Sequence, residues 1–185
     1  LVTVGASQAL DLALRAIINP GDEVIVIEPS FVSYAALVSL AGGVPVPIHT
    51  KGEMEFKLQP DELEEAITNK TKAIILCSPN NPTGTLLNKE ELTKIASIIE
   101  KYDLLVISDE IYAELTYDEA YSSFVSIEGM ADRTLLISGF SKGFAMTGWR
   151  LGYVAARPEF LSAMLKIHQY SMMCAPTMAQ YAAIE

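Results

Sequence analysis

Short apolar runs recur along this chain, and their spacing limits the folds open to it. Seven runs have the length and composition of buried strands: residues 1–4, 24–27, 44–48, 73–77, 104–108, 134–138 and 151–156. Between most of them lie stretches with apolar residues at helical spacing, such as residues 7–18, and Asn88 and Glu91 have the spacing of a helix capping box. This alternation predicts an α/β fold of three α/β/α layers around a mostly parallel seven-stranded sheet.

Length and composition agree with one domain. The 185 residues are enough for a full core, half of them are apolar, and no apolar run is long enough to span a bilayer. The net charge of −10 argues against nucleic acid or an anionic membrane as partner. Cys77 and Cys174 form no CxxC pair, and no secretory or transit peptide is recognisable, so we expect no disulfide framework and a reducing, cytoplasmic compartment.

Small, polar or aromatic side chains follow five of the expected strands. In a mostly parallel sheet the carboxyl ends of the strands share one edge, and ligands bind beyond that edge. We therefore expect a ligand site there. Its candidate residues are Gly5, Ala6 and Ser7 after the first strand, Phe31 after the second, Asn81 after the fourth, Asp109 and Tyr112 after the fifth, and Lys142 after the sixth.

Taken one at a time, the first of these residues have ordinary structural roles open to them. Gly5 and Ala6 fit a simple turn, with Ser7 as the N-cap of the next helix, as well as they fit a phosphate cradle at a helix N-terminus. Asn81 begins an Asn-Pro-Thr-Gly turn, and its amide is also able to bond a ring hydroxyl. Phe31 fits either a core position or a stack on a flat ring.

Asp109 is the candidate whose chemistry most strongly indicates a function, because a carboxylate at the end of an apolar strand needs a partner. One interpretation is a helix N-cap. The other is a partner for a protonated ring nitrogen, which suits pyridoxal phosphate because its ring must act as an electron sink. Tyr112, three residues further on, is either a core or interface tyrosine or a donor to a ring oxygen.

The stretch of residues 139–152 holds a lysine among small residues and an arginine eight positions later. The amine of Lys142 suits a Schiff base with a carbonyl group, and Arg150 suits an anionic tail of the same molecule or else a surface ion pair. His49 and His168 have no metal-ligand neighbours, and the cysteines have none either. We therefore expect both histidines to be structural and no metal site.

Residues 139–152, 78–85 and 108–112 together resemble three motifs of the class I and II aminotransferases, the fold type I pyridoxal-phosphate enzymes. The resemblance covers essentially the whole chain and is nearest to bacterial aspartate-type and broad-range members. It implies pyridoxal 5′-phosphate as cofactor, and transfer of an amino group from an amino acid to a 2-oxo acid. It also implies a homodimer, because the family's site is shared between subunits.

The resemblance implies a role for each residue that matches a family motif. Lys142 would hold the internal aldimine and then move the proton, and Asp109 would pair with the pyridine nitrogen. The ring contacts would come from Tyr112 and Asn81 at its phenolic oxygen and from Phe31 on its face. The phosphate contacts would come from Gly5, Ala6, Ser7 and Arg150. Many relatives have a hydroxyl three positions before the lysine, where this chain has Gly139, so Ser141, or else Ser138, would make that contact.

Family members are about twice as long as this chain, which starts at Leu1 and stops inside an expected helix. Residues 1–185 would then be the cofactor-binding large domain, without the N-terminal arm and the C-terminal small domain. The family's sheet has one antiparallel strand, for which residues 151–156 are the candidate. Two other functions share these motifs: a pyridoxal-phosphate lyase, of the C–S lyase or aminocyclopropane-carboxylate-synthase kind, and a non-catalytic sensor domain that binds the cofactor.

Overall fold

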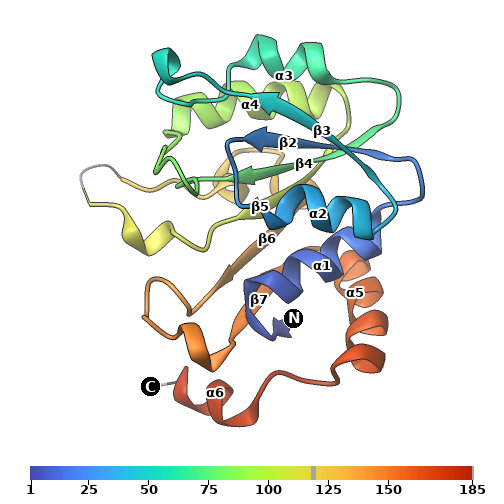
Figure 1. The fold of residues 1–185 in the computed structure, drawn as a ribbon, viewed down its shortest axis with the longest axis vertical. Helices are drawn as coiled ribbons and strands as arrows, with labels where there is room; N and C mark the ends of the chain where they lie inside the picture. The colour runs from blue at the N-terminus through green and yellow to red at the C-terminus, as the bar shows by residue number, and fades with distance from the viewer. Residues whose placement is uncertain (118–119, 185) are drawn as a thin grey trace.

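A single sheet of seven strands forms the centre of the computed structural model, which describes residues 1–117 and 120–184 (Figure 1). The strands are β1 (Val2–Thr3), β2 (Glu23–Glu28), β3 (Val44–His49), β4 (Thr71–Cys77), β5 (Leu105–Asp109), β6 (Thr134–Gly139) and β7 (Gly152–Ala155). Their order across the sheet is β1-β7-β6-β5-β4-β2-β3. The pairings among β2 to β6 are parallel, whereas β7 runs antiparallel to both of its neighbours. The predicted α/β class, the strand number and the antiparallel strand are confirmed.

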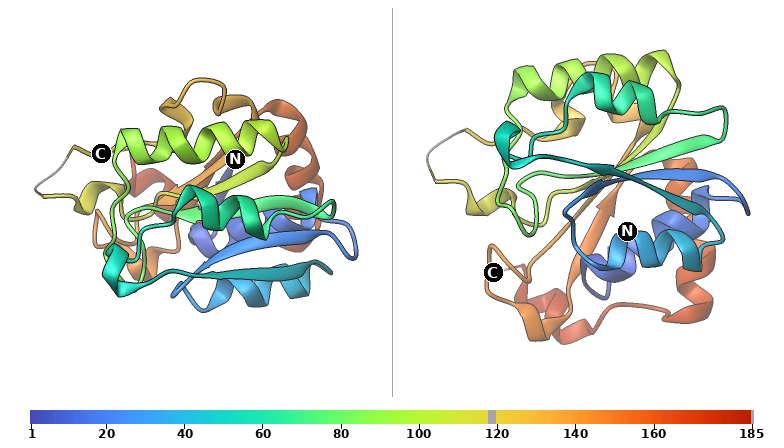
Figure 2. Two further views of the ribbon diagram at one scale, coloured as in Figure 1. Left: turned by 90° about the horizontal axis from the view of Figure 1, so that it is seen from above. Right: turned by 45° about the horizontal axis from the view of Figure 1, so that its top comes forward.

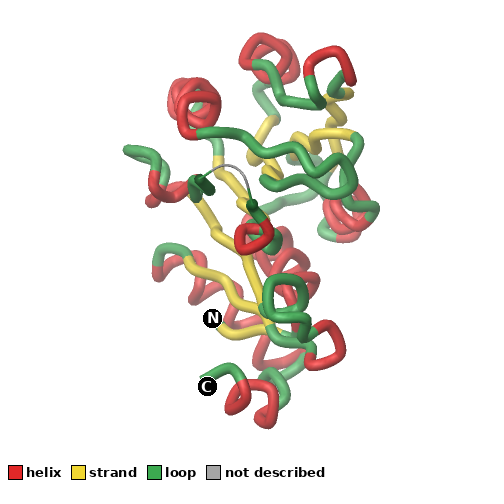
Figure 3. The backbone as a smooth tube through the Cα atoms, turned by 90° about the vertical axis from the view of Figure 1, so that its left-hand side faces the viewer, coloured by secondary structure: helices red, strands yellow, loops and turns green. Residues whose placement is uncertain are grey.

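Helices cover both faces of the sheet. The helices are α1 (Gly5–Ile17), α2 (Ser33–Leu40), α3 (Pro60–Ala66), α4 (Lys89–Lys101), α5 (Pro158–Ser171) and α6 (Thr177–Ala182). The short 3-10 turns are η1 (Gly52–Met54), η2 (Ala113–Leu115), η3 (Phe124–Ser126), η4 (Ala131–Arg133) and η5 (Thr147–Trp149). Figure 2 shows α2 and α4 on opposite sides of the sheet, and Figures 1 and 3 place α6 at the end of the molecule away from α3.

Alternating strand residues fill two separate cores, as the pleat of a strand requires. On β4, Ala73 and Ile75 pack with α1, α2 and α5, whereas Ile74 and Leu76 pack with α3 and α4. A strand buried on both faces has no polar side, which explains why these runs are apolar without alternation. The predicted three-layer arrangement is confirmed.

One local prediction differs from the structure. Helix α1 begins at Gly5, so Ser7 lies in its first turn and is not the N-cap. Gly5 has a φ of 75°, and this left-handed backbone turns the chain into the helix three residues earlier than a cap at Ser7 would place it. By contrast, the capping box on α4 is present: the Asn88 side chain accepts from Glu91 N at 3.0 Å, and Asn88 N donates to Glu91 Oε2 at 2.8 Å.

Strand β7 lies in close contact with the start of α1. A Cβ on Gly152 would come within 2.6 Å of the backbone at Gly5 and Ala6, and one on Gly139 would come within 2.8 Å of the Leu151 carbonyl oxygen. Neither position has room for a larger residue. The two glycines therefore allow residues 139–152 and the first turn of α1 to share one edge of the sheet.

We expect Gly152→Ala to lower the free energy of unfolding by about 1–3 kcal/mol, because the added methyl group overlaps backbone that has no room to move. Urea unfolding of the full-length protein measures this loss. Gly148→Ala is the matched control, since a Cβ there meets nothing within 4 Å, and its effect should stay within about 0.5 kcal/mol. Equal unfolding midpoints for the two variants would contradict the close approach described here.

Candidate functional site

A cavity of about 190 Å³ opens beyond the carboxyl ends of the central strands. Its lining consists of Ala6, Ser7, Leu10, Phe31, Tyr34, Asn81, Asp109, Ile111, Tyr112, Ser141, Lys142, Thr147 and Arg150. Nine of the ten predicted site residues are in this lining, although they come from segments more than a hundred residues apart. The tenth, Gly5, lies next to the Arg150 guanidinium. The sheet thus brings the predicted residues into one place.

Asp109 is the most deeply buried charged group of the cavity, with only 4% of its surface exposed. Its Oδ2 accepts a hydrogen bond from the Tyr34 hydroxyl at 2.7 Å, and its Oδ1 accepts one from Ile111 N at 3.2 Å. Burial raises the pKa of the Asp109 carboxyl above its ordinary value, and the two hydrogen bonds act in the opposite direction. The helix N-cap interpretation is wrong, because the next helical turn, η2, begins after Tyr112.

Tyr34 is a site residue that the sequence did not reveal. It comes from the first turn of α2, is 3% exposed, and meets the Phe31 ring edge-on with 5.6 Å between the ring centroids. Burial, and then the charge of Asp109, raises the pKa of Tyr34 well above its ordinary value, so the phenol stays protonated and donates. The only sequence signal was its position three residues after Phe31, at the start of an expected helix.

Lys142 and Tyr112 are neighbours in the lining of the cavity. The Lys142 Nζ lies 5.5 Å from the centroid of the Tyr112 ring, and both residues line the cavity together with Asn81. Within the described part of the chain, Lys142 forms no ion pair. Its amine is therefore not engaged with a carboxylate there and is able to meet a molecule that enters.

An anion-binding end forms where α1 begins. The first N–H groups of a helix have no acceptor within the helix, and the helix dipole adds positive potential there. A Cβ on Gly5 would meet the Arg150 guanidinium, so the glycine lets that cation lie directly against the helix start. Arg150 Nη1 donates to Thr147 O at 2.9 Å, and among the residues that the structure describes Arg150 has no carboxylate partner. The surface ion-pair interpretation is therefore wrong for the described chain.

Ser141 and Ser138 occupy different positions relative to the candidate site. Ser141 lines the cavity next to Lys142, whereas the Ser138 hydroxyl donates to Glu110 O at 3.3 Å and lines a different cavity. Ser138 lies within β6, whereas Ser141 lies in the turn that follows the end of this strand at Gly139. Ser141 is the hydroxyl that is available to an anion at Arg150.

Glu110 is a second residue that the sequence did not single out. Its side chain is buried, and its Oε1 accepts from the Ser108 hydroxyl at 2.9 Å, the Ser123 hydroxyl at 2.8 Å and Phe124 N at 3.1 Å. These bonds attach η3 to the end of β5. Glu110 does not line the candidate site, so we interpret it as a structural carboxylate that stabilises the segment next to Asp109.

The two histidines lie outside the lining of the candidate site. His168 is buried on α5 and its Nδ1 lies 3.2 Å from Gln8 Nε2 on α1. His49 is largely exposed at the end of β3, beside Glu28. The described residues contain no group of three or more His, Cys, Asp or Glu side chains that could hold a metal ion. In the same residues, no helix combines the length and hydropathy that crossing a membrane requires.

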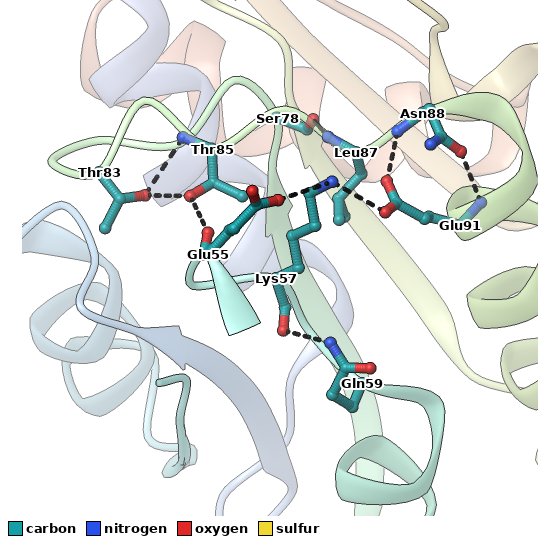
Figure 4. A network of polar contacts seen from close by, with 9 residues as sticks. All are labelled: Glu55, Lys57, Gln59, Ser78, Thr83, Thr85, Leu87, Asn88 and Glu91. Atoms are coloured by element: carbon teal, nitrogen blue, oxygen red, sulfur yellow. Dashed lines mark hydrogen bonds and ion pairs between the residues drawn. The ribbon is translucent and has the colours of Figure 1, made fainter. Parts of the chain in front are cut away.

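The turn that carries Asn81 is held in place by hydroxyl and amide groups. Asn80 Nδ2 donates to Pro29 O at 3.0 Å and to Thr83 Oγ1 at 2.9 Å, which joins the turn to the segment that carries Phe31. The hydroxyls of Thr83 and Thr85 lie 2.8 Å apart, and Thr85 donates to Glu55 O at 2.9 Å (Figure 4).

The same network continues to helix α4. Lys57 Nζ lies 3.0 Å from Glu91 Oε1 and 3.3 Å from Glu55 Oε2, and Glu91 also accepts from Asn88 N (Figure 4). The residues that follow η1 are therefore attached both to the Asn81 turn and to the start of α4. Polar bonds of this kind position a loop where no apolar core is available to do so.

A family model places the whole chain in one group of proteins. The model described as aminotransferase class I and II matches residues 1–185. The Bacillus subtilis protein YugH, whose name places it among the aminotransferases, is 62% identical over all of this chain and 48% of its own length. The aspartate aminotransferase of Pyrococcus abyssi is 49% identical over 99% of this chain and 47% of its own length. The chain thus spans about half the length of these curated relatives.

Solved structures agree with this placement. An aromatic aminotransferase from Pyrococcus horikoshii superposes with a TM-score of 0.97 at 48% identity, over 99% of this chain and 49% of that one. The aspartate aminotransferase of Thermus thermophilus, solved with maleate, superposes with a TM-score of 0.96 at 42% identity, over 100% of this chain and 48% of that one.

We expect Thr85→Val to loosen the turn around Asn81, because it keeps the shape of the side chain and removes the hydrogen bonds of its hydroxyl with Glu55 O and Thr83 Oγ1. Loss of one such bond is worth about 1 kcal/mol, so backbone amides of the turn that bond Asn80 and Thr85 should exchange with deuterium about fivefold faster. Mass spectrometry of peptides that cover residues 78–86 measures the exchange. Thr93→Val is the matched control, because Thr93 bonds only within α4. Unchanged exchange in Thr85→Val would show that the network does not hold the turn.

Proposed function

The chain belongs to the class I and II aminotransferases, and on that premise we propose that the full-length protein transfers an amino group from an amino acid to a 2-oxo acid with pyridoxal 5′-phosphate. The observation that carries the proposal is one cavity that combines buried Asp109, the unpaired amine of Lys142 within the described chain, and an anion-binding end at Arg150. The relatives are named as aminotransferases, which favours amino-group transfer over the lyase and sensor alternatives.

The donor set of the cavity fits the ring of this cofactor. A pyridine nitrogen that carries a proton needs a carboxylate, and Asp109 is the one carboxylate in the described lining. Its burial makes a cationic partner favourable, because a charge removed from water is stabilised by an opposite charge. Tyr112 and Asn81 would bond the ring's phenolic oxygen, and Phe31 would pack on the ring face.

The other end of the cavity fits the phosphate. The backbone of Gly5 and Ala6, the hydroxyls of Ser7 and Ser141, and the Arg150 guanidinium offer donors and positive charge in one place. A helix N-terminus with an adjacent arginine is a favourable anion site. Gly5 matters here because any side chain would displace the guanidinium.

Pyridoxal phosphate, when bound, supplies an aromatic ring that draws electron density away from the substrate's α-carbon. Asp109 would keep the proton on the ring nitrogen, which maintains that pull. Lys142 would hold the cofactor at its aldehyde group, and its amine would act as the base that takes the proton from the substrate's α-carbon and as the acid that returns it. Tyr112 and Asn81 would keep the ring in its plane during this transfer.

We also propose that residues 1–185 are the cofactor-binding large domain of a longer chain that works as a homodimer in the cytoplasm. The length of the relatives supports the first point. Support for the homodimer comes from the family resemblance, because the family's site is shared between subunits. Cys77 and Cys174 are free thiols, which suits a reducing compartment.

The assignment of Lys142 is tested by covalent labelling. We expect the full-length protein to turn yellow with pyridoxal phosphate, and borohydride reduction followed by peptide mapping to find the pyridoxyl group on Lys142. Lys142→Met should lose both the label and at least about a thousandfold in kcat, the scale of a lost acid–base and nucleophilic group. Lys166→Met, on the exposed side of α5, should keep both. Label on another lysine, or none, would refute the assignment.

The proposed domain boundary makes a second prediction. The family resemblance places the arginine that holds the substrate carboxylate outside residues 1–185. We therefore expect the 185-residue chain to show kcat/KM at least about a hundredfold below that of the full-length protein, because substrate orientation is lost. A coupled assay with several amino donors and 2-oxoglutarate or pyruvate measures both proteins. Equal turnover by the two proteins would refute the proposed boundary.

A further inference from the structure

We propose that Tyr34 is a positioning residue for the reaction, which holds Asp109 through its hydroxyl and Phe31 through its ring. One side chain of α2 would thereby set both the acid that faces the ring nitrogen and the surface on which the ring lies. This inference rests on the proposed function, because both contacts matter only if an aromatic cofactor occupies the cavity.

The hydroxyl contact is short, buried and directed at the oxygen that has no backbone donor. Tyr34 donates to Asp109 Oδ2 at 2.7 Å, while Oδ1 accepts from Ile111 N. Each carboxylate oxygen thus has one protein donor, and the carboxylate plane is fixed by two anchors from different elements. Removal of the Tyr34 hydroxyl would leave Oδ2 without its protein donor at a site that is almost closed to water.

The other ionisable groups near Asp109 do not replace this contact. On β4, the Cys77 thiol donates to Pro79 O at 3.3 Å, and burial raises the pKa of that thiol to about 12, so it stays neutral. On the other side, Glu110 adds negative charge and raises the pKa of Asp109. Lys142 and Tyr112 line the same cavity and would meet the cofactor. Tyr34 is therefore the side-chain donor that favours an ionised Asp109.

The ring contact is separate from the hydroxyl contact. The Tyr34 and Phe31 rings meet at 82°, the edge-to-face geometry that aromatic pairs prefer. Phe31 is only partly buried, whereas Tyr34 is 3% exposed and packs in the core with α1 and β4. The buried ring thus supports the more exposed one. Tyr34→Phe removes only the hydroxyl contact and keeps the ring contact, so the two effects are separable.

The closing experiment measures how the visible absorbance of bound pyridoxal phosphate changes with pH in the full-length protein. Without the Tyr34 donor the ionised form of Asp109 is less stable, so the proton shared with the ring nitrogen moves toward the carboxylate, which removes positive charge from the ring near the lysine nitrogen. We expect Tyr34→Phe to move the absorbance transition upward by about half a pH unit or more, and to weaken cofactor binding about tenfold. Tyr170→Phe, the same change at an 88% exposed position on α5, should alter neither value.

A second variant keeps the shape of the tyrosine side chain and is expected to shift the absorbance transition in the opposite direction. Site-specific replacement of Tyr34 by 3-fluorotyrosine makes the phenol a stronger donor, so the absorbance transition should move downward. A purely structural role for Tyr34 predicts no shift in either direction. This replacement also keeps the inference testable if Tyr34→Phe does not fold.

The cofactor-free protein provides a readout that does not depend on activity. Burial holds the folded-state pKa of Asp109 above its unfolded value of 3.8, so its contribution to stability is present below that value and is lost as pH rises through the folded pKa. Tyr34→Phe raises the folded pKa further. The stability gap between Tyr34→Phe and wild type should therefore widen, in urea unfolding, from pH 5 to pH 8. A stability difference between the two proteins that is the same at pH 5 and pH 8 would overturn the contact of Tyr34 with Asp109.

These experiments distinguish a failure of the proposed function from a failure of the positioning role of Tyr34. If wild type takes no label at Lys142, the proposed function fails, and the cofactor-free unfolding still tests the Tyr34–Asp109 bond. If wild type takes the label but Tyr34→Phe titrates like Tyr170→Phe, the function stands and the positioning role of Tyr34 is overturned.

Discussion

The parallel pairing of β4, β5 and β6 is the constraint on which the candidate site depends. In that pairing Cys77, Asp109 and Ile137 are direct neighbours, so β4 and β5 end together and β6 ends two residues later at the same edge. The loops that follow must then leave the sheet at one edge, and the side chains of Asn81, Tyr112 and Lys142 converge there although no short sequence connects them. A shift of one residue in any of these pairs would point Asp109 at the opposite face, because side chains alternate along a strand.

The site has two ends with opposite electrostatic preferences. At one end a buried carboxylate lacks a cation within the described chain and favours a protonated partner; at the other, the start of α1 and Arg150 favour an anion. A molecule with a cationic ring nitrogen and a phosphate satisfies both ends at once. Lys142 lines the same cavity, and its amine would meet a carbonyl group of that molecule. The polarity of the cavity, more than any one residue, favours pyridoxal phosphate.

Two kinds of force hold these side chains. Asp109 and Tyr34 belong to the packed core, where neighbours on α1 and β4 limit their movement. Asn81 lies on a turn without such packing, and hydrogen bonds from Asn80, Thr83 and Thr85 hold that turn to neighbouring segments. Hydrogen bonds from Ser123 and Phe124 to Glu110 hold the segment after β5 in the same way. Buried polar bonds of this kind rigidify a site only when each member has a partner.

The sequence by itself determined the layers, the strands and most of the site, because apolar period, turn residues and strand-end chemistry are local properties. Residues 151–156 and the capping box at Asn88 were predictable for that reason. Tertiary structure decided what depends on distant partners: the contact of Tyr34 with Asp109, the place of Ser141 in the cavity lining and of Ser138 outside it, and the close approach of Gly152 to α1. A tyrosine in a helix carries no local sign of the carboxylate that it meets 75 residues later, since only the crossing of α2 over the sheet brings them together.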